Sequence, residues 1–272
     1  MKDFKFSVLI CVYAGDDARF FKMAIESILE NSVAATEIIL VIDGPIGQEI
    51  ENVISRDLLE QCERAKVFRL EKNSGLAKAL NYGLSKCSYD WVFRADADDI
   101  NMINRFETQI NDILSNPDCD IFGSYITEYD DFQGEYVRSV PESDKKISNF
   151  VRWRSPFNHM TVAYNRAAVL RFGGYPDIFR KEDYALWRMM IGHGIKGYNN
   201  SLVLVRAYVG NGMHERRGGL CYLKSEFQLQ KFFYAVCKEK FVICACAGIV
   251  RISIFMMPVV LKKFVYKNFL RN

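Results

Sequence analysis

Residues 89–99, YDWVFRADADD, decide the fold class that the sequence predicts. The segment up to Ala95 is mostly apolar, as a buried strand is, and three carboxylates follow it within four residues, at Asp96, Asp98 and Asp99. Earlier stretches repeat this form, with a short apolar run, a polar turn and then a helical pattern. They span residues 7–29, 37–62 and 65–85. Alternation of strand and helix predicts an α/β fold, a mostly parallel sheet flanked by helices.

Polar segments follow the predicted strands. They are residues 13–17 (YAGDD), 43–44 (DG), 72–75 (KNSG) and 96–99 (DADD). Parallel sheets bind ligands beyond the carboxyl ends of their strands, so these segments should meet at one edge and form a nucleotide site. The loop at 72–75 opens a helix and can offer backbone N–H groups and positive charge to an anion. It is neither a Walker A loop nor a dinucleotide-binding fingerprint.

The carboxylates after residue 95 suit a hard divalent cation. Mn²⁺ and Mg²⁺ take oxygen ligands, and Mg²⁺ commonly uses one or two carboxylates together with substrate phosphates. An EF-hand loop is disfavoured, because Ile100 and Asn101 stand where that loop requires an oxygen ligand and a glycine. A metal-free acidic turn that caps the following helix is the alternative interpretation.

The second half of the chain has a mixed pattern. It predicts helices at 103–114, 166–171, 182–191 and 222–237, and strands at 121–128, 135–140 and 160–164. The helix that starts at Glu182 carries the apolar residues Leu186, Trp187, Met190 and Ile191, which we expect on one face.

Five segments occur in an order that resembles the inverting glycosyltransferases of family 2. They are residues 7–13 (SVLICVY), 38–43 (IILVID), 73–79 (NSGLAKA), 94–99 (RADADD) and 182–187 (EDYALW). The chain looks most like the bacterial enzymes that build O-antigen and exopolysaccharide repeat units. The resemblance implies a GT-A (Rossmann-like) domain over residues 1–220, with a nucleotide-sugar half to about residue 100 and an acceptor half from about 101. Residues 221–272 then form a C-terminal helical segment.

The resemblance also implies roles on the donor side. Tyr13 and Asp43 would contact the nucleobase of a UDP-sugar. Asp96 would lie near the ribose and the metal, and Asp98 would be the principal ligand of Mn²⁺ or Mg²⁺. The other predicted donor-binding residues are Lys72, Gly75, Lys78 and Arg94.

Residues 214–219, HERRGG, form a second candidate donor contact. Arg216 and Arg217 offer bidentate contacts to a diphosphate, and His214 is a candidate third metal ligand. A solvated charged loop is the alternative interpretation.

On the acceptor side, the family resembled uses the Asp of its Glu-Asp pair to take the proton from the acceptor hydroxyl. Inversion requires a base on the sugar face opposite the leaving diphosphate, so Asp183 is the predicted catalytic base. The predicted acceptor-binding residues are Asn158, His159, Glu182 and Trp187. An acidic first helical turn, which the helix dipole favours, and a buried hydrogen-bonded histidine are the alternatives.

The net charge of +3 conceals a basic C-terminus. From Cys237 to Asn272 there are seven Lys or Arg against Glu239 alone, a net charge of +6, so the first 236 residues carry −3. Residues 241–261 are mostly apolar and long enough to cross a bilayer. Arg251 at their centre would cost about 2.5–3.5 kcal/mol there, which favours a helix lying on the membrane, or packed on the domain, over a span. Basic residues beside apolar sequence favour a membrane partner over nucleic acid.

The cysteines indicate a reducing compartment. All eight are scattered without a CxxC pair, as reduced thiols of a cytoplasmic protein are.

These patterns predict a metal-dependent inverting glycosyltransferase. It would move a hexose, galactose or glucose, from a UDP-sugar to a polyprenyl-diphosphate-linked saccharide for O-antigen, capsule or exopolysaccharide synthesis, at the inner face of the cytoplasmic membrane. A sugar nucleotidyltransferase is one alternative, but it should carry a Gly- and Lys/Arg-rich loop after the first strand, where this chain has residues 14–17, AGDD. A non-catalytic sugar-nucleotide-binding protein is the other.

Overall fold

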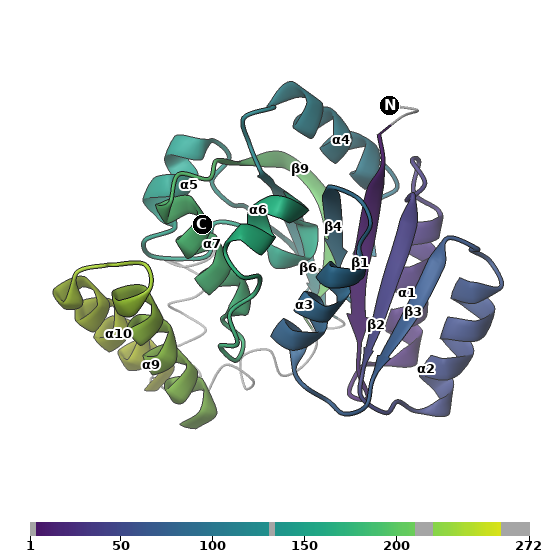
Figure 1. Cartoon of the computed structure of the whole chain (residues 1–272), viewed down its shortest axis with the longest axis horizontal. Helices are drawn as coiled ribbons and strands as arrows, with labels where there is room; N and C mark the ends of the chain where they lie inside the picture. Colours follow the sequence, from purple (N-terminus) through teal and green to yellow (C-terminus); the bar gives the residue numbers. More distant parts are fainter. Residues whose placement is uncertain (1–3, 131–133, 210–219, 257–272) are drawn as a thin grey trace.

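A computed structural model of the chain describes residues 4–130, 134–209 and 220–256 (Figure 1). Its strands are β1 (Phe6–Val12), β2 (Glu37–Asp43), β3 (Ala65–Leu70), β4 (Trp91–Ala95), β5 (Asp99–Asn101), β6 (Ile121–Asp130), β7 (Gly134–Arg138), β8 (Ala163–Asn165) and β9 (Gly197–Tyr208). Its α-helices are α1 (Ala18–Leu29), α2 (Gln48–Asn52), α3 (Leu76–Lys86), α4 (Arg105–Ser115), α5 (Asp144–Phe150), α6 (Arg166–Arg171), α7 (Glu182–Gly192), α9 (Leu220–Ala235) and α10 (Phe241–Met256). A π-helix, η1 (Val53–Leu59), follows α2, and a 3₁₀ turn, η2 (His159–Thr161), precedes β8.

The predicted parallel sheet is present in the first half of the chain. Strands β3, β2, β1 and β4 lie side by side and run parallel. Alternate residues of β1 enter two cores: Val8 packs with α1, η1 and α4 on one face, and Leu9 packs with α3, α6 and α7 on the other. Every residue of β2 is buried, because helices cover both faces. The carboxyl ends of these strands therefore form one exposed edge.

The second half of the sheet is mixed. Strand β8 pairs antiparallel with β4, β6 pairs antiparallel with β8, and β7 pairs with β6 as the sequence predicts. The long strand β9 lies parallel to β6 and then pairs antiparallel with β5, completing the order β3-β2-β1-β4-β8-β6-β9-β5. We did not predict β9, since Asn199, Asn200 and Ser201 break its apolar pattern.

Two local predictions are wrong. Residues 160–164 are not one strand: Thr161 donates its backbone N–H to the carbonyl of Asn158 at 2.9 Å, which forms η2, and β8 begins only at Ala163. Helix α7 is not amphipathic. Of its eleven residues, nine are buried, because the sheet covers one side and α5 and α9 lie on others.

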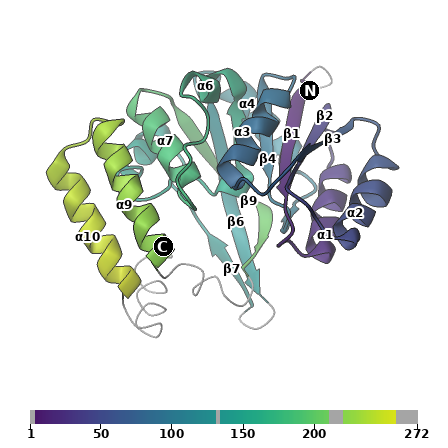
Figure 2. The same ribbon diagram turned by 60° about the horizontal axis from the view of Figure 1, so that its bottom comes forward.

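The C-terminal hairpin, which we define as α9 and α10, packs beside α7 and away from the β1–β3 half of the sheet (Figures 1 and 2). Leu229 and Phe233 of α9 belong to the same buried cluster as α7. Within the described residues, none of the helices combines the length and apolarity that crossing a bilayer requires.

Candidate active site

The ends of β1, β2 and β4 carry the predicted donor-side residues. Tyr13 follows β1 and is half-exposed, Asp43 ends β2, and Asp96 follows β4. An added Cβ at Gly15 would lie 2.5 Å from the Tyr13 ring, so the ring rests directly over this glycine. An aromatic ring beyond the sheet edge is suited to stacking on a nucleobase.

Asp43 fixes the neighbouring loop. Its two carboxylate oxygens accept the backbone N–H groups of Ser74 at 2.7 Å and Gly75 at 2.9 Å. The turn needs Gly44, which has φ of 87° and where a Cβ would lie 2.4 Å from Asn73 N. The expectation that this loop turns its N–H groups toward an external anion fails for Ser74 and Gly75, because Asp43 already accepts both. Asp43 therefore fixes the 72–75 loop at this edge of the sheet.

Lysines border the same edge. Lys72 is exposed, and Lys78 on α3 pairs with Asp177 at 3.1 Å. His214, Arg216 and Arg217 lie outside the described residues, so their predicted roles remain predictions.

The carboxylate cluster consists of Asp96, Asp98 and Asp99. One oxygen from each lies within 4.8 Å of the others, Asp98 being exposed and Asp99 buried. Strand β5 places Asp99, and the backbone N–H of Tyr208 on β9 donates to its Oδ1 at 3.2 Å. Its Oδ2 has no hydrogen-bond partner in the part of the chain that the structure describes.

Asp16 is a fourth carboxylate at this site, which we did not assign from the sequence. Its Oδ2 accepts the backbone N–H of Tyr13 at 2.9 Å. Burial, together with the charges of Asp98 and Asp96, raises its pKa to about 7. The only signal in the sequence was its position after the first strand.

The cluster of Asp96, Asp98 and Asp99 fits a divalent cation, and Asp16 adds a further carboxylate nearby. Burial raises the pKa of Asp99 well above its usual range, and repulsion from Asp96 and Asp98 adds to this. An Mn²⁺ or Mg²⁺ ion would offset the repulsion among these carboxylates, with the buried Asp99 carboxylate lying behind the other two. Asp98 and Asp96 would hold it, and it would stabilise negative charge on a departing diphosphate.

Arg94 links this cluster to the acceptor side. Its side chain is 1% exposed, and its Nη1 forms an ion pair with Asp96. The charge of Asp96 raises the pKa of Arg94 despite burial, so the guanidinium stays protonated. Burial lowers the pKa of His159, and the positive charge of Arg94 lowers it further. Burial raises the pKa values of Glu182 and Asp183, and the charge of Arg94 partly opposes this rise. Arg94 therefore lies between the predicted donor and acceptor residues.

A second buried arginine supports the cluster from below. Arg105 of α4 donates through Nη2 to the carbonyl of Arg94 at 2.7 Å and through Nη1 to Asn101 Oδ1. It thus holds both ends of the acidic turn. We did not identify Arg105 from the sequence, where it reads as an ordinary residue of a helical first turn.

The acidic pair opens α7. Glu182 is 8% exposed and Asp183 is half-buried. Burial raises the pKa of Glu182 to about 7, with a further contribution from Asp183. Burial also raises the pKa of Asp183, and Ser155 Oγ lies 3.5 Å from its Oδ2. A carboxylate with a raised pKa is suited to accept a proton near neutral pH.

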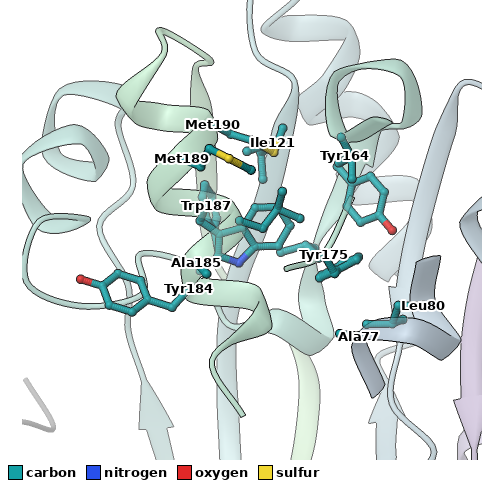
Figure 3. Packing of buried hydrophobic residues seen from close by; sticks show 14 of the residues in the cluster. Ala77, Leu80, Ile121, Tyr164, Tyr175, Tyr184, Ala185, Trp187, Met189 and Met190 are labelled. Carbon is teal, nitrogen blue, oxygen red and sulfur yellow. The ribbon is translucent and has the colours of Figure 1, made fainter. Parts of the chain in front are cut away.

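The other acceptor-side residues lie at different depths. His159 is half-buried and its Nε2 lies 3.3 Å from the hydroxyl of Tyr175. Asn158 is buried and donates to the carbonyl of Ser124. Trp187 is fully buried and its ring lies 6.1 Å from that of Tyr175 (Figure 3). Its ring also lies 6.3 Å from that of His159, so Trp187 packs against both residues and does not reach the surface.

Asn81 of α3, which we did not predict, joins the two halves of the site. Its side chain donates to the carbonyl of Tyr175 at 2.8 Å and accepts the backbone N–H of Tyr175 at 2.7 Å. An added Cβ at Gly174 would lie 2.2 Å from Asn81 Oδ1, so glycine is required there.

Comparison with solved structures supports the fold. The fold resembles that of Staphylococcus aureus TarS residues 1–349 in complex with UDP-GlcNAc, with a TM-score of 0.68, 17% identity, and coverage of 92% of this chain and 72% of that one. It also resembles the mannosyltransferase PcManGT of Pyrobaculum calidifontis, in complex with GDP-Man and Mn²⁺, with a TM-score of 0.64, 14% identity, and coverage of 97% and 80%. The fold is of the GT-A type, as the sequence predicts.

Sequence comparison identifies the family. The chain is 38% identical over 273 residues to the Escherichia coli UDP-Gal:α-D-GlcNAc-diphosphoundecaprenol β-1,3-galactosyltransferase, covering 98% of this chain and 97% of the relative. It is 35% identical to the amylovoran biosynthesis glycosyltransferase AmsE of Erwinia amylovora, covering 97% and 98%. The sequence model of the family "Glycosyl transferase family 2" matches residues 7–179. This chain therefore belongs to glycosyltransferase family 2.

Proposed function

We propose that this glycosyltransferase moves a hexose, galactose or glucose, from a UDP-sugar to a polyprenyl-diphosphate-linked saccharide with inversion. The observation that carries the proposal is that Arg94, which pairs with Asp96 of the carboxylate cluster, also lies close enough to the acidic pair of α7 for its charge to act on Glu182 and Asp183. The similarity to the Escherichia coli UDP-Gal:α-D-GlcNAc-diphosphoundecaprenol β-1,3-galactosyltransferase extends over nearly the whole chain, which supports the donor and the lipid-linked acceptor. Family membership favours transfer over nucleotidyl transfer or simple binding.

The residues divide the work of an inverting displacement. Tyr13 would stack on the uracil, and Asp98 and Asp96 would hold the cation beside the diphosphate. Asp183 would accept the proton from the acceptor hydroxyl as that oxygen attacks the anomeric carbon. Attack from the side opposite the leaving diphosphate inverts the configuration.

A donor screen tests this function. The purified chain is incubated with UDP-galactose, UDP-glucose or UDP-GlcNAc and with GlcNAc or GalNAc linked through diphosphate to a lipid, with and without Mn²⁺. We expect hexose transfer that requires the cation, and linkage analysis of the product identifies the anomeric configuration. Product with the donor's own configuration, or no transfer from any UDP-sugar, contradicts the proposal.

We further propose that the C-terminal hairpin docks on the inner face of the cytoplasmic membrane, where a lipid-linked acceptor is found. Helix α10 exposes Phe241 (68%), Val242 (68%), Ile249 (65%) and Val250 (58%). Lys238 and Lys240 stand exposed before it, and α10 contains no acidic residue. An apolar helix face flanked by lysines suits an anionic lipid surface.

Replacing Val242 and Ile249 with Glu should weaken vesicle binding. Two new negative charges near an anionic surface cost about 2 kcal/mol, in addition to the lost apolar contact, so we expect at least a tenfold loss of binding to phosphatidylglycerol vesicles. Co-sedimentation measures this. The matched control is Leu114→Glu, an exposed apolar residue of α4, which should bind as the unmodified chain does. The docking surface is contradicted if the double variant binds vesicles as well as the unmodified chain and the Leu114→Glu control do. It is also contradicted if a chain lacking residues 238–272 binds as well as the unmodified chain.

A further inference from the structure

Glu226 of α9 is a buried carboxylate held between two cations. Its side chain is fully buried, it does not belong to the carboxylate cluster, and it takes no part in the mechanism above. Its Oε2 is 3.5 Å from Lys181 Nζ, and its Oε1 is 3.3 Å from Arg251 Nη1. A buried charge is costly unless it is paired, so Glu226 holds these two segments together.

Lys181 connects Glu226 to the acidic pair. It is the residue immediately before α7, and its side chain is 12% exposed. Its Nζ donates to the hydroxyl of Tyr222 at 2.8 Å and lies 4.3 Å from the centre of that ring. Its backbone carbonyl accepts the N–H of Ala185, which starts the first turn of α7. The position of Lys181 therefore sets where this turn begins.

Arg251 reaches the same turn from α10. Its Nη2 donates to the hydroxyl of Tyr184 at 3.1 Å and to the carbonyl of Trp153. The Tyr184 hydroxyl in turn donates to the carbonyl of Val151 at 2.9 Å. The charge that would oppose membrane insertion of α10 is thus turned toward the domain.

We propose that Lys181, Glu226 and Arg251 are positioning residues, a buried ion triad through which the C-terminal hairpin fixes the first turn of α7 and with it the base Asp183. The inference rests on the proposed function, because it assumes that Asp183 acts on the acceptor. It gives the hairpin a catalytic task that does not depend on membrane docking. The two helices form the rear support of the acceptor site.

Lys181 also acts on Asp183 through its charge. Three positive groups face Asp183 and lower its pKa: Lys181, Arg138 and Arg94. The neighbouring carboxylate of Glu182 and that of Asp183 repel each other. Burial raises the pKa of Asp183 and the charge of Lys181 partly offsets this rise, so removing that charge raises the pKa of Asp183 further. Since the base must be ionised, activity should then be lost at a higher pH than in the unmodified chain.

The test compares Lys181→Met with Lys181→Arg, using a short-chain, water-soluble acceptor analogue without membranes. We expect K181M to lower kcat by about 10- to 100-fold, the scale of a misplaced catalytic group, with donor KM unchanged. Its acid limb in the pH profile should move to higher pH. K181R keeps the charge and should recover most of kcat and the original limb.

A second variant and a control complete the test. Glu226→Gln should lower kcat as K181M does, and thermal denaturation shows whether the variant is folded at the assay temperature. Lys231→Met removes an exposed lysine from α9 and should leave kcat unchanged. Wild-type kcat and pH profile in K181M overturn the triad proposal, as does an equal loss in K181M and K181R with an unshifted limb. If the unmodified chain and K231M also fail to transfer, the proposed function itself has failed.

Discussion

Replacing Asp98 with Asn should abolish sugar transfer while leaving the fold intact. Asp98 is the exposed member of the carboxylate cluster, so its loss removes a charged ligand without opening a cavity. Charge stabilisation by a bound cation contributes several kcal/mol to the transition state, and about 4 kcal/mol corresponds to about a 10³-fold loss of rate. We expect kcat to fall by at least that factor in a radiolabelled transfer assay with saturating Mn²⁺.

Binding measurements separate a lost ligand from a damaged site. A calorimetric titration of Mn²⁺ into the protein in the presence of UDP should show weaker cation binding in D98N. Asp118→Asn, an exposed carboxylate at a distance from the cluster, should retain both affinity and turnover. Normal turnover in D98N would remove Asp98 from the proposed metal site.

The second large effect is expected from Asp183→Asn. The amide keeps the size of the carboxylate and its contact with Ser155 but does not accept the proton of the acceptor hydroxyl. Loss of a general base costs about 10²- to 10⁴-fold in rate, whereas UDP and Mn²⁺ bind elsewhere and should bind as before. The measurements are kcat with the lipid-linked acceptor and the affinity for UDP by calorimetry.

The pH profile gives this prediction a second readout. Burial raises the pKa of Asp183, and the unprotonated form is the active one, so activity should fall as the pH drops through a value above that of an ordinary aspartate. Glu182, with its pKa raised to about 7, is the competing base. If Glu182→Gln rather than D183N abolishes transfer and the acid limb, the base is Glu182.

The parallel half of the fold and the donor edge could be predicted because both are local in sequence. Each strand of that half is mainly apolar, and a polar segment follows each strand within a few residues. The carboxylates at 96–99 lie close together for the same reason. The order of the segments and the family resemblance then identified the acidic pair.

The rest depends on contacts between distant residues. Strand β9 is recognisable only through its partners, and Arg105 gains its role from a carbonyl that the folded chain places beside it. The apolar residues around Trp187 follow the pattern of an amphipathic helix. Helix α7 instead lies between the sheet and other helices, so that most of its residues are buried. Sequence spacing does not contain this information.

The pairing of β5 with β9 sets the order in which the site forms. Asp99 obtains its backbone donor from Tyr208, which is 109 residues later in the chain. Closure of so long a loop is slow compared with local pairing, and during synthesis it waits until β9 has left the ribosome. The parallel half can fold earlier, since its strands lie within the first 95 residues. The growing chain therefore contains every strand of the parallel half before it contains all the groups of the carboxylate site.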